Sequence, residues 1–207
     1  MTLLNLTLVA AALLVALAFR PWRQLAGGAL LSPLLAALVI TPWLWALPWL
    51  QHLPLRLQLS GACLILLMLG WPLAMLVFGA VALATGWIAP VTPAAQLDMA
   101  LWLGMVPATL ALGLGWVLRR WVAHNPFVYI LGRAFLGTAL CLFAAGTLAH
   151  WSGQALGTNV EPGLALVARW LMAWGDAVMT GMIVAICVAF RPQWLATWSD
   201  RLYLKAP

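Results

Sequence analysis

The sequence predicts an all-α integral membrane protein, a polytopic bundle of transmembrane helices. Of its 207 residues, 66% are hydrophobic and only 7% are charged, which is far from the composition of a soluble domain. Several uninterrupted apolar runs also reach the roughly 20 residues that a helix needs to cross a bilayer. These runs are continuous and rich in Leu and Ala, whereas the strands of a membrane barrel alternate apolar and polar residues. Helices are therefore the expected elements.

Turns that carry Pro, Gly or charge divide the chain into six apolar segments. They cover residues 3–19, 27–50, 57–88, 98–118, 127–151 and 163–190. As one helix, the segment 57–88 would be about 48 Å long, well above a bilayer core of about 30 Å. Gly70, Trp71 and Pro72 also interrupt it. We expect this segment to cross twice, as two short or partly re-entrant helices.

The basic residues set the orientation, because short cytoplasmic loops collect Lys and Arg. With two crossings in 57–88, the loops on one side contain Arg20, Arg23, Arg119, Arg120, Arg191, Arg201 and Lys205. The other side contains only Arg56. We therefore predict about seven membrane passages, with the N-terminus outside and the C-terminus in the cytoplasm. The net charge of +6 is spread over single residues and pairs, so membrane lipid is an expected partner and nucleic acid is not.

We expect one transmembrane helical domain over residues 1–190 and a short cytoplasmic tail over 191–207. In the tail, Trp194 and Trp198 lie one helical turn apart with basic residues beyond them, which is typical of an interfacial helix that anchors the chain or docks a partner. Most other tryptophans fall at predicted membrane boundaries, among them Trp45 and Trp102 at the outer one.

Three ionisable residues fall inside the predicted passages, where charge is costly and marks buried pairs or functional sites. Arg133 and Asp176 come to a similar depth when counted from the helix ends, so we predict that they pair and hold the last two helices together. A transport role for Asp176 is the alternative. Arg169 lies two turns before Asp176 on nearly the same face, and its guanidinium either extends toward the interface or meets Glu161.

The predicted topology also gathers polar residues at the outer end of the bundle, beside Met1. They are His52, Asp98, His150 and Glu161. Imidazole and carboxylate groups are ligands for divalent first-row metals, so an external capture site for such an ion is one interpretation. The other is that these are ordinary solvated loop residues, because their spacing matches no metal-binding motif. We expect no tightly bound cofactor, and a divalent transition metal is a candidate only as substrate.

Small residues recur four positions apart in three passages, a spacing that lets helices approach closely. They are Ala12 and Ala16 in the first, Ala145 and Ala149 in the sixth, and Gly181, Ala185 and Ala189 in the last. Packing within the chain is the default interpretation, and packing against a partner subunit is the alternative. Cys63, Cys141 and Cys187 lie inside apolar runs without CxxC spacing, which indicates small core residues.

Enzyme motifs are missing from the sequence. It contains no HExxH helix, no GxSxG elbow, no Walker A loop, and no second intramembrane Asp to form a dyad with Asp176. We therefore predict that the chain is not an enzyme.

Several stretches resemble the membrane permeases of energy-coupling factor transporters, in the group related to the cobalt/nickel uptake component. They are LQLSGACLILLMLGWPLAMLV (57–77), LGMVP (103–107), HNPFVYILGRAFLGTAL (124–140), GDAVMTGMIVAICVAFRPQW (175–194) and WSDRLYL (198–204). The resemblance covers most of the chain after residue 56. It is most specific in the last helix, where a Gly-acid pair precedes an Arg-Pro-x-Trp exit.

This resemblance implies a substrate-capture subunit of a multi-subunit importer in the bacterial cytoplasmic (inner) membrane, powered by separate ATP-binding subunits and joined by a transmembrane coupling subunit. Metal-uptake members hold their substrate with a Met-His-x-x-Asp-Gly-like N-terminus and a His ahead of a Gly-Gly or Gly-Ala pair. This chain begins Met-Thr-Leu, and Gln58 stands three residues before Gly61-Ala62, where that His is expected. A Gln carbonyl binds cobalt or nickel less well than imidazole, so the substrate is a transition-metal ion or another small solute. Asp176 matches the acid of the family's final helix.

We therefore expect an uptake subunit that captures a small solute or metal ion. Two other classes of function stay open. One is a noncatalytic membrane interaction subunit without a substrate of its own. The other is an ion-coupled carrier that works through Asp176.

Overall fold

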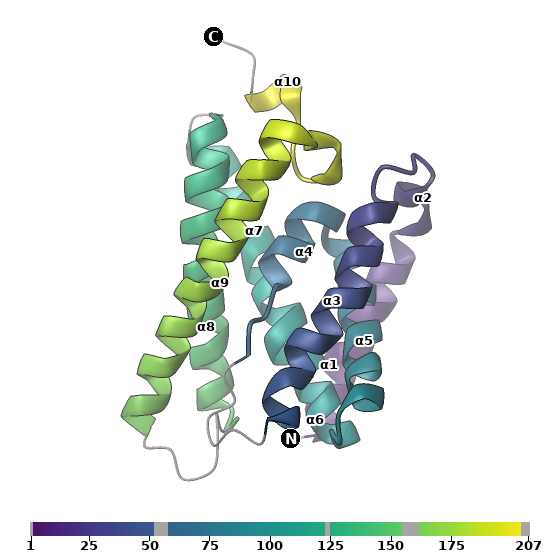
Figure 1. Cartoon of the computed structure of the whole chain (residues 1–207), viewed down its shortest axis with the longest axis vertical. Coiled ribbons are helices and arrows are strands. Elements are labelled where there is room, and N and C mark those ends of the chain that lie inside the picture. The colour runs from purple at the N-terminus through teal and green to yellow at the C-terminus, as the bar shows by residue number, and fades with distance from the viewer. Residues whose placement is uncertain (1, 52–57, 123–124, 155–161, 204–207) are drawn as a thin grey trace.

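The computed structural model describes residues 2–51, 58–122, 125–154 and 162–203 (Figure 1). Within these residues every regular element is a helix. The elements are α1 (Thr2–Ala18), α2 (Trp22–Leu25), α3 (Leu31–Leu50), α4 (Ala62–Leu69), α5 (Trp71–Ile88), α6 (Pro93–Asp98), η1 (Met99–Met105), α7 (Val106–Trp121), η2 (Val128–Leu136), α8 (Gly137–Trp151), α9 (Pro162–Phe190), η3 (Pro192–Trp194) and α10 (Asp200–Tyr203). Two π-helical turns, η1 and η2, lead without a break into α7 and α8.

Five stretches of helix are long and apolar enough to cross a membrane. They are Leu31–Leu50, Trp71–Ile88, Pro93–Trp121, Val128–Trp151 and Gly163–Phe190. The helix Leu3–Ala18 is apolar but shorter. Large apolar side chains such as Val39, Trp87 and Phe190 are exposed on the outside of the bundle, as expected for a surface that lipid covers. These findings confirm the predicted all-α membrane bundle.

The bundle has two distinct ends (Figure 1). α2 and α10 lie at one of them, which we call the α10 end. α6 and the beginning of α1 lie at the opposite one, which we call the α6 end. α4 lies in the middle, in contact with α3, α5, α7 and α9. Its central position makes the two ends of this short helix important for the rest of the fold.

The segment 58–88 is divided at Gly70, as its sequence predicts, but the two parts differ in length. α5 has 18 residues and is long enough to cross a membrane, whereas α4 has only 8 residues, about 12 Å. Gly70 has φ 77° and ψ 164°, a region of backbone conformation that only Gly adopts without strain. The turn lies at the α10 end, where a Cβ on Gly70 would be 3.7 Å from the side chain of Gln24 and 3.8 Å from that of Ala196.

The described part of the tail is not the single interfacial helix that its sequence predicts. It consists of the 3-10 turn η3, a hydrogen-bonded turn from Leu195 to Trp198 and the four-residue helix α10. The reason is that Trp198 and Tyr203 stack on each other at 4.7 Å and pack edge-on against Tyr129, so these rings are turned into the protein. The tail folds back over the end of α4.

Four of the small residues predicted at helix contacts pack inside the chain. Ala16, Ala145 and Ala149 are buried, and a Cβ on Gly181 would lie 3.2 Å from the Phe135 side chain of η2. Ala12 and Ala185 are half-buried, and Ala189 is exposed. Cys63, Cys141 and Cys187 are free and buried, which confirms that they are core residues.

Candidate functional site

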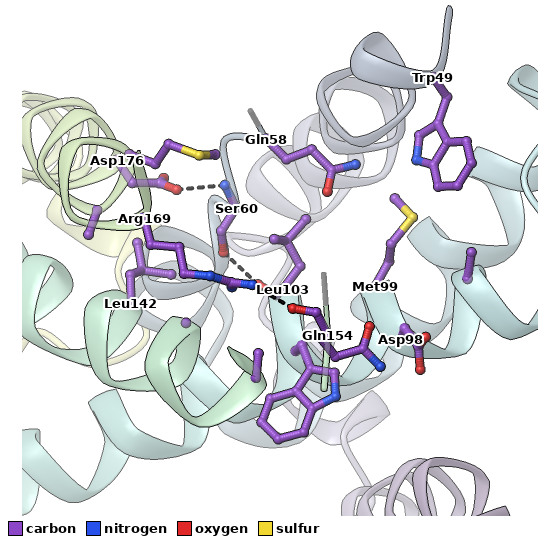
Figure 2. A pocket seen from close by; sticks show the side chains of 16 residues that line it. Trp49, Gln58, Ser60, Asp98, Met99, Leu103, Leu142, Gln154, Arg169 and Asp176 are labelled. Carbon is purple, nitrogen blue, oxygen red and sulfur yellow. Dashed lines mark hydrogen bonds between the residues drawn. The ribbon is translucent and has the colours of Figure 1, made fainter. Parts of the chain in front are cut away.

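A pocket of about 160 Å³ lies between α3, the segment 58–60, α6 with η1, α8 and α9, in the half of the bundle nearest the α6 end (Figure 2). Its polar lining consists of Gln58, Ser60, Asp98, Gln154, Arg169 and Asp176. Its larger apolar side chains are Trp49, Met99, Trp102, Leu103, Leu142 and Met172. Polar and charged groups are costly inside a membrane bundle, so their concentration around one cavity indicates a binding site.

Asp176 closes the deep side of this pocket and caps the beginning of α4. It is only 5% exposed. The backbone N–H of Ser60 donates to Asp176 Oδ2 at 2.6 Å, and the N–H of Gly61 donates to Oδ1 at 3.0 Å (Figure 2). The first N–H groups of a helix have no partner within it and carry partial positive charge, so a carboxylate is favoured there. Asp176 therefore stabilises a helix that begins in the interior of the bundle.

Ser60 is tied to three other helices through the rest of its polar atoms. Its carbonyl accepts from Trp45 Nε1 at 3.0 Å, and its hydroxyl donates to the Leu103 carbonyl. The hydroxyl also accepts from the N–H of Ala62 at 3.1 Å. Non-helical backbone at membrane depth is tolerated only where protein or water satisfies its polar groups. Here the side chains of α3 and α9 and a carbonyl of η1 satisfy them.

The Leu103 carbonyl can accept from Ser60 because of a proline. In a regular helix this carbonyl would bind the N–H four residues later, but that residue is Pro107, which has no N–H. The helix adopts the wider π form over Met99–Met105, a feature that often accompanies functional sites. The same π turn carries Met99 and Trp102 into the pocket lining.

Trp45, which the sequence analysis placed at the depth of the outer membrane boundary, has its ring inside the bundle. It is fully buried and stacks against Phe78 at 6.4 Å. Its ring N–H binds Ser60, and its backbone carbonyl accepts from Gln58 Nε2 at 2.8 Å. The side chain of Gln58 is therefore held against α3 while it lines the pocket.

Arg169 enters the pocket from α9, two helical turns before Asp176. One of its terminal nitrogens donates to the Gln154 carbonyl at 2.9 Å. Its Nε is buried and has no hydrogen-bond partner among the described residues. A Cβ on Gly146 would lie 3.3 Å from the Arg169 side chain, so the small residue in α8 makes room for it. The sequence analysis expected the Arg169 guanidinium either at the interface or at Glu161, whereas the structure places Arg169 in the lining of the pocket. Glu161 lies outside the described residues.

Asp98 lines the pocket from the last position of α6. Its Oδ1 accepts from Asn5 Nδ2 at 2.6 Å. Asn5 is 4% exposed and belongs to α1. The sequence analysis missed Asn5, although a lone amide in an apolar run of helix is itself a signal of a buried polar contact.

Arg133 does not have the partner that was predicted for it. It lies near the α10 end, with Cζ 5.7 Å from the centre of the Tyr129 ring and its guanidinium against Gly115 of α7. Asp176 instead binds the start of α4. The depth count failed because α9 has 29 residues, about 43 Å, and is longer than the bilayer core, so counting down from its first residue does not give the distance to its last one. Asp176 lies about 14 residues, or roughly 21 Å, from Phe190. Arg133 is only five residues into the helix that begins at Val128.

Of the predicted outer cluster, the structure places only Asp98 in the lining of the pocket, whereas His150 is half-buried on α8 and is not among the lining residues. Gln58, singled out by the family resemblance, also lines the pocket. Met1, His52 and Glu161 lie outside the described residues. Across the part of the chain that the structure describes, no three His, Cys, Asp or Glu side chains are grouped so that they could hold a metal ion.

Comparison with protein-family models, curated proteins and solved structures finds no match to this chain. The geometry of the pocket is therefore the main basis for a functional assignment.

Proposed function

We propose that this chain is the solute-binding membrane subunit of an importer. In this proposal it lies in the bacterial cytoplasmic membrane with seven passages, of which α4 and the non-helical residues before it make the third. The α6 end faces outward, so that the pocket receives a small solute from outside. The supporting observation is a pocket with polar and charged lining that is built around a helix broken inside the bundle.

Broken helices have a physical link to solute binding in membranes. Transporters place their substrates at interrupted helices, where free backbone groups and helix ends interact with the solute. The break at 58–61 has this character, because the segment is non-helical, lines the pocket through Gln58 and Ser60, and is held by side chains from α3 and α9. Such an arrangement costs more free energy than a continuous apolar helix, and a binding function accounts for that cost.

The energy for uptake would come from partner subunits. The chain contains no Walker A loop, and its resemblance to energy-coupling factor permeases suggests ATP-binding subunits and a second membrane subunit as partners. The test is to express the chain with the products of neighbouring genes and isolate it by an affinity tag. Copurification of an ATPase, with ATP-dependent uptake that the chain alone lacks, supports the proposal. Uptake by the isolated chain in liposomes contradicts it and favours an ion-coupled carrier.

A carrier that works through Asp176 has less support than a capture subunit. Both carboxylate oxygens accept from the backbone N–H groups of Ser60 and Gly61, directly before α4, which is a structural role. Protonation of Asp176 in each transport cycle would weaken the start of α4 each time. An Asp176→Asn variant that folds and transports normally would argue against carriage through this residue.

The orientation can be tested with single cysteines, because Cys63, Cys141 and Cys187 are buried and give a low background. Thr92→Cys lies at the α6 end and Arg120→Cys lies at the end of α7 near the α10 end, and both positions are exposed. We expect a membrane-impermeant maleimide added to intact cells to label position 92 and not 120. The opposite pattern would invert the topology.

Metal analysis of the purified protein addresses the metal-ion alternative directly. Saturable binding of Co²⁺ or Ni²⁺ at one equivalent would establish a metal substrate.

A further inference from the structure

The pocket contains a positive charge that its own residues leave without a counterion. The Arg169 guanidinium donates to a backbone carbonyl, which is a neutral acceptor. Among the described residues no carboxylate forms an ion pair with it, since Asp176 binds α4 and Asp98 binds Asn5. A cation inside a membrane bundle is stabilised by an anion, and the planar fork of Arg suits a carboxylate. Arg169 therefore favours a ligand with a carboxylate.

Asp98 supplies a negative charge on another side of the same pocket (Figure 2). Its partner Asn5 is a neutral amide, so the hydrogen bond orients the carboxylate without neutralising it. The rings of Trp49 and Trp102 line the same pocket, and the faces of indole rings attract cations. This side of the pocket favours a ligand with a cationic nitrogen.

Asp176 is less available to a ligand than Asp98. Both of its carboxylate oxygens already accept from backbone N–H groups, those of Ser60 and Gly61. The charged groups that remain available to a ligand are therefore Arg169 and Asp98, one of each sign. A metal ion would be repelled by Arg169, and a simple anion would be repelled by Asp98. A molecule with both charges is complementary to the whole lining.

We infer that the ligand of the Arg169–Asp98 pocket is a small zwitterion, with its carboxylate at Arg169 and its cationic nitrogen at Asp98, such as an amino acid. A cavity of about 160 Å³ is close in size to the cavity of about 150 Å³ that holds benzene, so a compound of about six nonhydrogen atoms, the size of a small amino acid, fits. Met99, Met172 and Leu142 provide an apolar wall for the rest of the molecule. The inference rests on the proposed function, because it names the class of solute that the same pocket binds.

The test measures binding to the full-length chain in lipid nanodiscs by calorimetry. The probes are the proteinogenic L-amino acids and 4-aminobutanoate. Each is compared with the acid that lacks its amino group and with the amine that lacks its carboxylate, and Co²⁺ and Ni²⁺ form a separate arm. We expect saturable binding of at least one zwitterion, and at least tenfold weaker binding of its acid and its amine.

Two variants assign the charges to the two ends of the ligand. Arg169→Met keeps most of the side-chain length and should weaken zwitterion binding about 10- to 100-fold, the loss expected for a charged hydrogen-bond partner. Arg169→Lys should recover part of that loss. Asp98→Asn should weaken binding of the zwitterion by a similar factor but should not weaken binding of the deaminated acid. Arg120→Met and Asp200→Asn, which are exposed and far from the pocket, are matched controls and should bind like the unmodified chain.

The outcomes separate the inference from the proposed function. If a metal ion, a simple acid or a simple amine binds and zwitterions do not, the inference is overturned and a solute-binding subunit remains. If zwitterions bind equally well to the Arg169→Met and Asp98→Asn variants, the ligand lies elsewhere and the inference is again overturned. If no arm shows saturable binding to a folded chain, both the inference and the proposed function fail.

Discussion

The two ends of α4 present the same physical problem and are stabilised by different chemistry. A helix that begins and ends inside a bundle leaves its first N–H groups and its last carbonyls without partners where water is scarce. At the first end a buried side chain, Asp176, accepts from Ser60 and Gly61. At the last end the backbone of the tail donates to the helix, from Ala196 N–H to Met68 and from Thr197 N–H to Leu67, at 3.0 and 3.3 Å.

As a consequence, the first end of α4 borders a pocket, whereas side chains of the tail fill the space at the last end, which we call the sealed end. The carboxylate end borders a cavity of about 160 Å³ with three charged side chains. At the α10 end, the rings of Tyr129, Trp198 and Tyr203 pack together, and the cavity beside Arg133 is only about 10 Å³. A single charged cap inside the bundle leaves room for a ligand, whereas a capping segment of chain brings its own side chains and fills the space.

Removing the charged cap should have the largest effect. Asp176→Leu leaves the N–H groups of Ser60 and Gly61 buried without an acceptor, at a cost of about 1–3 kcal/mol each. We expect a loss of about 2–5 kcal/mol in the free energy of unfolding, measured by tryptophan fluorescence during titration of detergent micelles with SDS. Asp176→Asn keeps one acceptor oxygen and should lose about half as much. If Asp200→Asn in the exposed tail costs as much as Asp176→Asn, the cap has no special role.

The second-largest loss of stability is expected at Gly70, where the chain reverses direction between α4 and α5. Gly70→Ala forces an L-residue to φ 77° and ψ 164°, which costs about 1–3 kcal/mol whatever space surrounds it. Gly113→Ala is the matched control, because Gly113 is helical, exposed and has no atom within 4 Å of an added Cβ. We expect Gly113→Ala to be neutral or stabilising in the same unfolding assay. Equal effects of the two substitutions would mean that the turn at Gly70 adapts its backbone.

The fold was largely predictable from the sequence, because its signals are local. Apolar runs of membrane length and the Gly70-Trp71-Pro72 interruption predict the helices and the division of 58–88. The depth of Asp176 was predicted wrongly although the predicted bounds of 163–190 match α9, because this helix is longer than the bilayer core and its two ends give different depths. Its partners were not predictable from side-chain chemistry at all, since they are backbone N–H groups 115 and 116 residues away in the sequence.

The site was predictable in composition but not in geometry. Asp98, Arg169 and Asp176 were singled out by being polar at or near membrane segments, and Gln58 by its place in the family resemblance; the structure places all four around one pocket. The missing signal was Ser60-Gly61 ahead of an apolar run, which is typical of a helix beginning and would have placed the start of α4. Contacts between helices, such as the one from Asn5 to Asp98, depend on packing that no local pattern encodes.

Ser60→Ala tests the charged end without removing its charge. The substitution deletes a hydroxyl that donates to Leu103 and accepts from Ala62, and it leaves both bonds to Asp176 in place. We expect the free energy of unfolding to fall by about 1–2 kcal/mol, because the Leu103 carbonyl loses the hydrogen bond from Ser60. Pro107, four residues after Leu103, has no N–H to replace it. Ser199→Ala in the tail is a control. A cost equal to that of Asp176→Leu would shift the main support of α4 from the carboxylate to the hydroxyl.

The smallest effect is expected at the sealed end. Thr197→Val removes a hydroxyl that donates to Leu67 at 2.9 Å and contacts the Tyr129 hydroxyl at 2.7 Å, but it keeps the volume and both backbone bonds of the tail. The Leu67 carbonyl therefore retains the N–H of Thr197, and the loss should be about 0.5–1.5 kcal/mol. Ligand binding should be unchanged, because the pocket lies at the opposite end of α4. A loss as large as that of Asp176→Leu would show that side chains cap both ends of α4, and the contrast between a charged end and a backbone-capped end would no longer hold.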